Sequence, residues 1–161
     1  MTLRLRDTTS GDLDFVLRCE SDPDAAPFIV RWDRARHERA IRDPDEAHLL
    51  ILDRRRALGF VLLAGLDSDP DSVELRRIVV VERGQGVGRR ALTMVLDYAF
   101  DTLGAQQVWL DVMVDNIRAR RAYASAGFVL EGVVRDGLIT PDGRRSIAIM
   151  SVLRTQWRAA S

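Results

Sequence analysis

Lysine is absent from the 161-residue sequence, so all 24 of its basic residues are arginines. Arginine keeps its proton at physiological pH and does not form the Schiff base that a catalytic lysine forms. It also does not replace the lysine of the G-x-x-x-x-G-K-[ST] phosphate loop. The missing residue type therefore excludes Schiff-base enzymes that use a lysine and nucleotide-binding proteins with that loop.

Cysteine and long apolar runs are also scarce. The single cysteine, Cys19, allows no internal disulfide, and it falls in an amphipathic helical pattern that predicts packing rather than chemistry. The opening residues MTLRLRDTTSGDL lack the apolar core of a secretory signal. The longest apolar run, GFVLLAGL, is far shorter than the roughly 20 residues that span a bilayer. We expect a cytoplasmic protein that does not enter a membrane.

Excess charge of one sign is absent, because 24 acidic residues balance the 24 arginines. No overall basic field favours nucleic acid or an anionic membrane, so we expect neither as a partner. The two histidines, His37 and His48, have no companions at metal-ligand spacing, and we predict no metal site. His37 stands among charged residues of a predicted helix, which predicts a solvated position.

The hydrophobic pattern predicts one domain over residues 1–161 with a mixed α/β fold. Strands precede and follow a central strand–helix–strand–helix unit with one parallel crossover, so about seven strands form a mostly antiparallel sheet with about four helices. The predicted strands lie near residues 2–6, 47–52, 58–66, 73–81, 107–114, 128–137 and 145–154. The predicted helices lie near residues 10–19, 33–42, 86–103 and 116–127.

Three alternate glycines, Gly84, Gly86 and Gly88, separate an apolar β-branched run from the third predicted helix. Glycine weakens both strands and helices, which indicates that the backbone itself is needed here. Free N–H groups at the positive end of a helix dipole suit a phosphate or pyrophosphate. A tight turn without a ligand is the alternative.

A dinucleotide-binding site is a second interpretation of the same residues. The segment GVGRRA, residues 86–91, fits the G-x-G-x-x-A fingerprint, and Asp111 in the next predicted strand is placed for a ribose contact. Such a fold needs a series of parallel strand–helix units after the fingerprint, and only one crossover helix follows here. A nicotinamide-nucleotide enzyme therefore stays as an alternative.

Two motifs carry a resemblance to a known family. Residues Arg83, Gly86 and Gly88 form R-x-x-G-x-G, and residues 116–128 fit N-x-x-A-x-x-x-Y-x-x-x-G-F. Together they resemble the acyl-CoA-binding motifs of the GCN5-related N-acetyltransferase (GNAT) superfamily. The likeness is detailed from Glu74 to Phe128, and the order of elements agrees along the whole chain. Within the family, the sequence is similar to the branch that acetylates ribosomal-protein N-termini and small amines.

The resemblance implies acetyl-CoA as cosubstrate, no metal, and a central parallel strand pair that is splayed. The pantetheine arm would lie along the strand, the pyrophosphate in the glycine loop, and the amide of Asn116 on the arm. The arginines at 118, 120 and 121 would meet the adenosine phosphate or form a solvated helix face. The implied coenzyme-binding residues are Ile78, Val79, Val80, Val81, Arg83, Gly84, Gln85, Gly86, Val87, Gly88, Arg89, Arg90, Asn116, Ala119 and Tyr123.

The resemblance also implies catalytic roles. Tyr123 stands where similar enzymes place the acid that protonates the leaving thiolate, although an aromatic at this spacing also suits packing. Glu74 resembles the general base of some members, but it would also pair with Arg76, and water is a further base. A backbone N–H of Val79 or Val80 would stabilise the oxyanion. Phe28 and Trp32 would form a wall of the acceptor site or part of the core.

We therefore expect an acetyl-CoA-dependent N-acetyltransferase that acts on a primary amine of a small molecule or a protein N-terminus. The amine would attack directly in a ternary complex. Its partners are acetyl-CoA and the amine, and a homodimer is left open. The alternatives are a catalytically silent acyl-CoA sensor, the nicotinamide-nucleotide enzyme, and a family member that uses a longer acyl chain.

Overall fold

A seven-stranded mixed sheet organises the computed structural model, which describes residues 1–160. The strand order is β1-β2-β3-β4-β5-β7-β6, and every neighbouring pair is antiparallel except β4 and β5. The strands are β1 (Leu3–Asp7), β2 (Glu46–Asp53), β3 (Arg56–Ala64), β4 (Ser72–Val80), β5 (Gln107–Met113), β6 (Val129–Thr140) and β7 (Gly143–Leu153). The predicted mixed α/β fold with seven strands and one parallel pair is confirmed.

The helices are α1 (Leu13–Glu20), α2 (Arg34–Arg42), α3 (Val87–Asp97), α4 (Ile117–Ser125) and α5 (Arg154–Ala160). Short 3-10 turns lie at Ser10–Asp12 and Ala26–Phe28, and a π turn at Tyr98–Thr102 prolongs α3. The first four helices match the predicted ones, whereas α5 was not predicted. No helix within residues 1–160 is long and apolar enough to cross a membrane.

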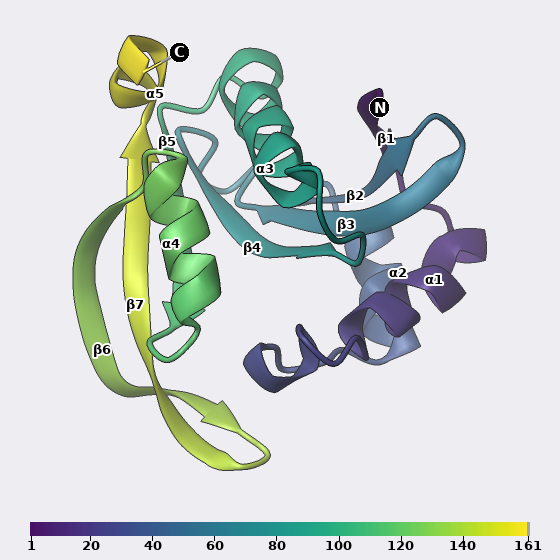
Figure 1. Cartoon of the computed structure of the whole chain (residues 1–161), viewed down its shortest axis with the longest axis horizontal. Helices are drawn as coiled ribbons and strands as arrows, with labels where there is room; N and C mark the ends of the chain where they lie inside the picture. The colour runs from purple at the N-terminus through teal and green to yellow at the C-terminus, as the bar shows by residue number, and fades with distance from the viewer. Residues whose placement is uncertain (161) are drawn as a thin grey trace.

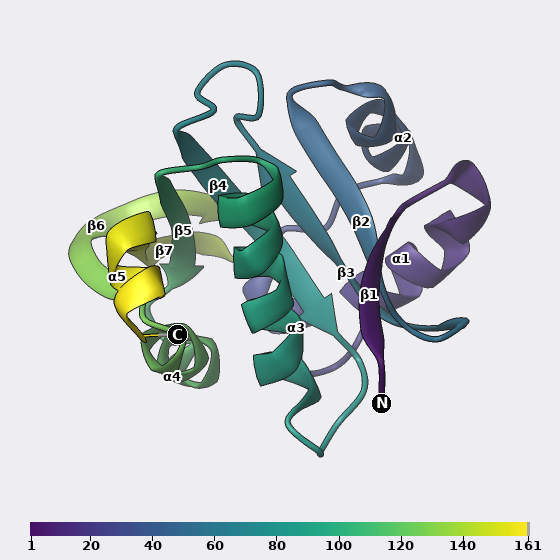
Figure 2. The same ribbon diagram turned by 90° about the horizontal axis from the view of Figure 1, so that it is seen from above.

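The helices cover both faces of the sheet. Figure 1 shows α3 on one face and α1 and α2 on the other, and Figure 2 shows α4 and α5 beside the strands of the C-terminal half. The middle of β2 and most of β3 are buried, because alternate side chains face opposite helices. Leu50 and Phe60 pack with Cys19 of α1, as predicted for this cysteine, while Val61 packs with α3.

The parallel pair separates soon after it forms. The β4–β5 ladder contains only the pairs Ser72–Gln107, Val73–Val108 and Glu74–Trp109. Beyond Glu74 the two strands diverge, as Figure 1 shows between β4 and β5. The side of β4 that faces β5 therefore lacks a strand partner along its second half, and a cleft opens there.

Candidate active site

The opening between β4 and β5 forms the cleft that we call the splay cleft. Its walls come from the segment before α2, from both splayed strands, from α4 and from the β6–β7 hairpin. The lining residues are Ala25, Phe28, Ile29, Val30, Glu74, Arg76, Arg77, Ile78, Val79, Asp111, Val112, Met113, Asn116, Ala119, Tyr123, Leu138 and Ile147. Segments from most of the chain thus meet at one place.

Tyr123 is positioned by α4, which begins at a capping residue. The side chain of Asn116 accepts a hydrogen bond from the Ala119 N–H at 3.3 Å, so Asn116 and Ala119 of the motif together start the helix. The Tyr123 ring lies 5.6 Å from the Phe128 ring, at an interplanar angle of 61°. Within residues 1–160 the Tyr123 hydroxyl has no hydrogen-bond partner. Both the packing role and a free hydroxyl at the cleft are therefore present in one side chain.

Two effects weaken Tyr123 as an acid. Desolvation, followed by the negative charge of Asp111, raises the pKa of Tyr123 to about 12. The phenol consequently stays protonated throughout the physiological pH range, which a proton donor requires.

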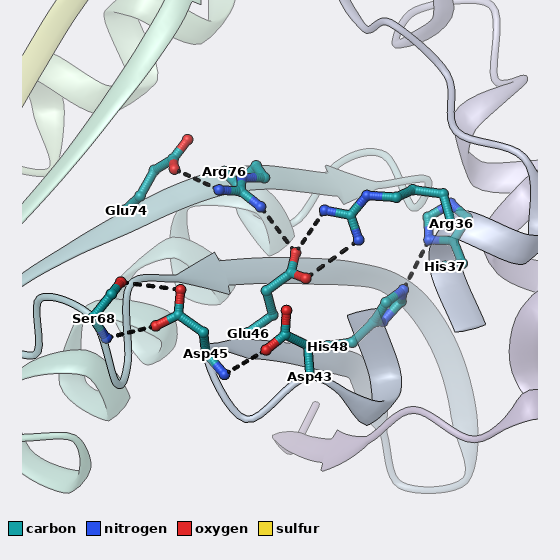
Figure 3. A network of polar contacts seen from close by, with 9 residues as sticks. All are labelled: Arg36, His37, Asp43, Asp45, Glu46, His48, Ser68, Glu74 and Arg76. Atoms are coloured by element: carbon teal, nitrogen blue, oxygen red, sulfur yellow. Dashed lines mark hydrogen bonds and ion pairs between the residues drawn. The ribbon is translucent and has the colours of Figure 1, made fainter. Parts of the chain in front are cut away.

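Glu74 lies in the splay cleft and is also bound to an arginine. Its carboxylate accepts a hydrogen bond from Arg76 at 3.0 Å, and Arg76 donates to Glu46 at 2.9 Å. Glu46 is nearly buried and binds Arg36 as well, at 3.0 Å. Figure 3 shows this alternation of charges from Glu74 on β4 to Arg36 on α2. Glu74 is thus a carboxylate held in place by an arginine rather than an isolated one.

Asp111 is the second carboxylate of the splay cleft, and it differs from Glu74 in its surroundings. Within residues 1–160 it has no hydrogen bond or ion pair. Although its side chain is exposed in the open cleft, desolvation raises the pKa of Asp111, and the charge of Glu74 adds to this effect while Arg76 opposes it. From the sequence we predicted only a ribose contact for Asp111, in the dinucleotide interpretation. The sequence signal for a wider role is a charged residue inside the apolar strand QVWLDVMV.

The glycine loop forms a separate pocket beside the splay cleft. The glycine pocket is lined by Val80, Glu82, Arg83, Gly84, Gly86, Val87, Gly88, Arg89, Arg118 and Ala122. Gly86 caps α3 with φ 66°, and added Cβ atoms at Gly84, Gly86 and Gly88 would meet nothing within 4 Å. The N–H groups of Gly88 and Arg89 have no acceptor within the described part of the chain. The pocket therefore presents open backbone and free donors at a helix N-terminus, which suits an anion.

Three of the residues predicted to bind the coenzyme line neither the splay cleft nor the glycine pocket. Val81 packs beside the core of α1, Gln85 takes φ 55° in the loop, and Arg90 donates to the Met1 carbonyl at 3.0 Å. Arg83 lines the glycine pocket and pairs with Asp22 and Asp24, each at 2.8 Å.

The helix α4 arginines divide between two places. Arg118 lines the glycine pocket, while Arg120 donates to the Val114 carbonyl at 2.9 Å. Arg120 and Arg121 border a shallow apolar depression with Leu130.

The two predicted aromatics of the acceptor wall also separate. Phe28 lines the splay cleft. Trp32 is not among its lining residues: the Arg36 guanidinium lies 3.8 Å from its ring centroid, and the His37 ring lies 5.1 Å away. The hairpin residues Leu138 and Ile147 take part in the wall instead, and no local sequence signal indicated them.

The predicted solvated position of His37 is wrong. Its side chain is fully buried and binds Glu20 at 2.8 Å and His48 at 3.0 Å, and His48 binds Thr8 at 2.8 Å. Glu20 also pairs with Arg77, whose guanidinium donates to the Val30 carbonyl at 2.8 Å. A buried polar chain thus runs from Thr8 to the splay cleft. Within residues 1–160 no group of three or more His, Cys, Asp or Glu residues is placed to hold a metal ion.

Comparisons with known proteins agree on one family. The model of the acetyltransferase (GNAT) family matches residues 13–128. A spermidine N(1)-acetyltransferase from Vibrio cholerae is 25% identical over 167 residues, which cover 96% of this chain and 95% of that protein. An uncharacterized N-acetyltransferase from Mycobacterium bovis is 36% identical over 110 residues, covering 66% and 69%.

Solved structures show the same fold. The spermidine N-acetyltransferase from Vibrio cholerae in complex with CoA and spermine superposes with a TM-score of 0.84 at 23% identity, covering 97% of this chain and 98% of that one. A second structure, of a putative acetyltransferase, gives a TM-score of 0.81 at 27% identity, covering 98% and 88%.

Proposed function

The chain belongs to the acetyltransferase (GNAT) family, and from this premise we propose that it acetylates a primary amine of a small molecule or a protein N-terminus. It is an N-acetyltransferase with acetyl-CoA as cosubstrate. The finer proposal is direct attack of the amine on the thioester within a ternary complex. The observation that carries it is the free Tyr123 hydroxyl at a cleft that adjoins an anion-binding pocket.

The splay and the glycine pocket offer the two parts of a coenzyme site. Beyond Glu74, the edge of β4 that faces β5 has no strand partner. A ligand would pair there with the β4 backbone from Ile78 onward, as another strand would. The N–H groups of Gly88 and Arg89 would bind the pyrophosphate, and Arg83 and Arg118 would add positive charge. When bound, acetyl-CoA supplies the activated acetyl group.

Proton transfer is assigned to residues of the splay cleft. Tyr123 would donate a proton to the departing thiolate, since its phenol is protonated and unpartnered. Glu74 or a water molecule would accept the proton of the amine, and an N–H of Val79 or Val80 would stabilise the oxyanion. Phe28 would contact the acceptor, and Trp32 would support the cleft from behind through Arg77, whose guanidinium lies 5.1 Å from the Trp32 ring centroid.

The test is release of free thiol from acetyl-CoA in the presence of peptides, amino acids, polyamines and aminoglycosides, with mass spectrometry of the acetylated product. We expect amine-dependent release by the wild-type protein and a large loss in Glu74→Gln if the carboxylate takes the proton. Binding of acetyl-CoA without release with any amine would contradict the proposal and favour the silent sensor. Competition among acyl-CoA esters of increasing length tests the longer-chain alternative. The single parallel strand pair and the family leave the nicotinamide alternative without support.

A further inference from the structure

The charges that line the splay cleft are unequally available to a ligand. Four charged residues line it: Glu74, Arg76, Arg77 and Asp111. Glu74 and Arg76 bind each other at 3.0 Å, and Arg76 is also held by Glu46. Arg77 is bound by Glu20. Asp111 is left as the lining charge that has no hydrogen bond or ion pair within residues 1–160.

A cationic acceptor would therefore find one free anionic partner. An ammonium group at Asp111 would form a charge-assisted hydrogen bond within the cleft that Tyr123 also lines. A second ammonium on the same molecule would meet carboxylates that already bind arginines, together with the positive charges of those arginines. Desolvating an unpaired charge is costly, so the cleft disfavours it.

Apart from Asn116 and Tyr123, the remaining lining residues are apolar, and the largest of them come from three parts of the chain. Phe28 and Ile29 precede α2, Met113 ends β5, and Leu138 and Ile147 belong to the β6–β7 hairpin. These side chains offer contact area to a hydrocarbon chain or ring and no charge to a distant ammonium.

We propose that the acceptor is a primary monoamine that binds with its ammonium group at Asp111 and its apolar body between the Phe28 wall and the C-terminal hairpin. The ammonium group then loses one proton to Glu74 or a water molecule, and the neutral amine attacks the thioester carbonyl. This inference rests on the proposed acetyl transfer and narrows its substrate class. It separates this chain from its Vibrio cholerae relative, which is named for spermidine, a polyamine.

The deciding experiment compares hexylamine with 1,6-diaminohexane, which share one hydrocarbon body and differ by one ammonium group. Phenethylamine and spermidine extend the comparison, and kcat/KM is measured by thiol release. We expect the monoamines to exceed the diamine and spermidine by at least about tenfold, as expected for an unpaired charge that is desolvated. Equal or higher values for 1,6-diaminohexane or spermidine would overturn the inference and leave acetyl transfer intact. Release with a peptide or amino acid but with none of these four amines would overturn the inference and leave the proposed function intact. Release with no amine of either panel would overturn both.

Two variants test the assignment of charge. Asp111→Asn keeps the side-chain shape, and we expect KM for hexylamine to rise at least about tenfold while calorimetry finds unchanged acetyl-CoA affinity. An unchanged KM would remove Asp111 as the anchor. Arg76→Gln frees the carboxylate of Glu74 and leaves Glu46 bound to Arg36 alone, and we expect the ratio of diamine to monoamine kcat/KM to increase. A constant ratio in that folded variant would contradict the charge argument.

Discussion

Replacing Tyr123 with phenylalanine separates the hydroxyl from the ring that carries it. The contact with the Phe128 ring is kept, and the lost hydroxyl has no hydrogen-bond partner within residues 1–160. We therefore expect the free energy of unfolding to change by no more than about 0.5 kcal/mol. Acetyl-CoA affinity should also stay close to the wild-type value.

The expected loss of rate follows from the pKa of Tyr123, about 12. A thiol has an ordinary pKa of about 8.5, so full proton transfer from this phenol to a thiolate is uphill by roughly 5 kcal/mol. The hydroxyl would then help mainly by hydrogen bonding as the thiolate departs. We expect the low end of the usual range for general acid catalysis, a decrease in kcat of about 10²-fold.

Single-turnover mixing with the acceptor measures the chemical step directly. A thioester whose leaving thiol has a lower pKa should lose less rate in Tyr123→Phe, because its thiolate needs less help. A wild-type rate for the variant would refute the acid role and leave Tyr123 as a packing residue. A collapse of acetyl-CoA affinity would instead assign the hydroxyl to binding.

Three further outcomes are expected. Gly88→Ala adds a Cβ that meets no protein atom within 4 Å, at a helical position without positive φ, so the fold should be unaffected. Calorimetry should find acetyl-CoA affinity at least about tenfold weaker. Unchanged affinity would contradict the phosphate role of the loop. Gly59→Ala would place a Cβ 2.0 Å from the Val79 carbonyl oxygen, so denaturant titration should find about 1–3 kcal/mol less stability, and wild-type stability would mean that β4 moves freely. Burial, followed by the charge of His37, lowers the pKa of His48 from 6.5 to about 3. Between these two pH values the unfolded chain binds one more proton than the folded chain, so the free energy of unfolding falls as pH drops, by up to about 1.4 kcal/mol per pH unit. His48→Gln should flatten this dependence between pH 4 and 6, and parallel curves would refute it.

The parts of the molecule that the sequence predicted are those with local signals. A few adjacent residues specify the glycine loop and the Asn116 cap. The hydrophobic pattern along β2 to β5 predicts the sheet. Leu138 and Ile147 reach the splay cleft through the bend of a long hairpin, whose register shifts between Val134 and Leu138. No pattern within the hairpin indicates where that bend carries a side chain.

His37 was mispredicted for a different reason. Its charged neighbours led us to predict a solvated side chain. Its helical spacing points the other way, because Ala40, three residues later, is buried on the same face of α2. Its partner Glu20 is distant in sequence, and such an interaction is visible only in the folded chain.

The buried chain from Thr8 to Glu20 has a direction. When the His37 ring donates to Glu20 from Nε2, its Nδ1 is free to accept the Nε2 hydrogen of His48. His48 must then accept from the Thr8 hydroxyl at Nδ1. Both imidazoles would thus hold the same tautomer, and every bond dipole would point from β1 towards α1. Nitrogen chemical shifts of the two rings would report this ordering.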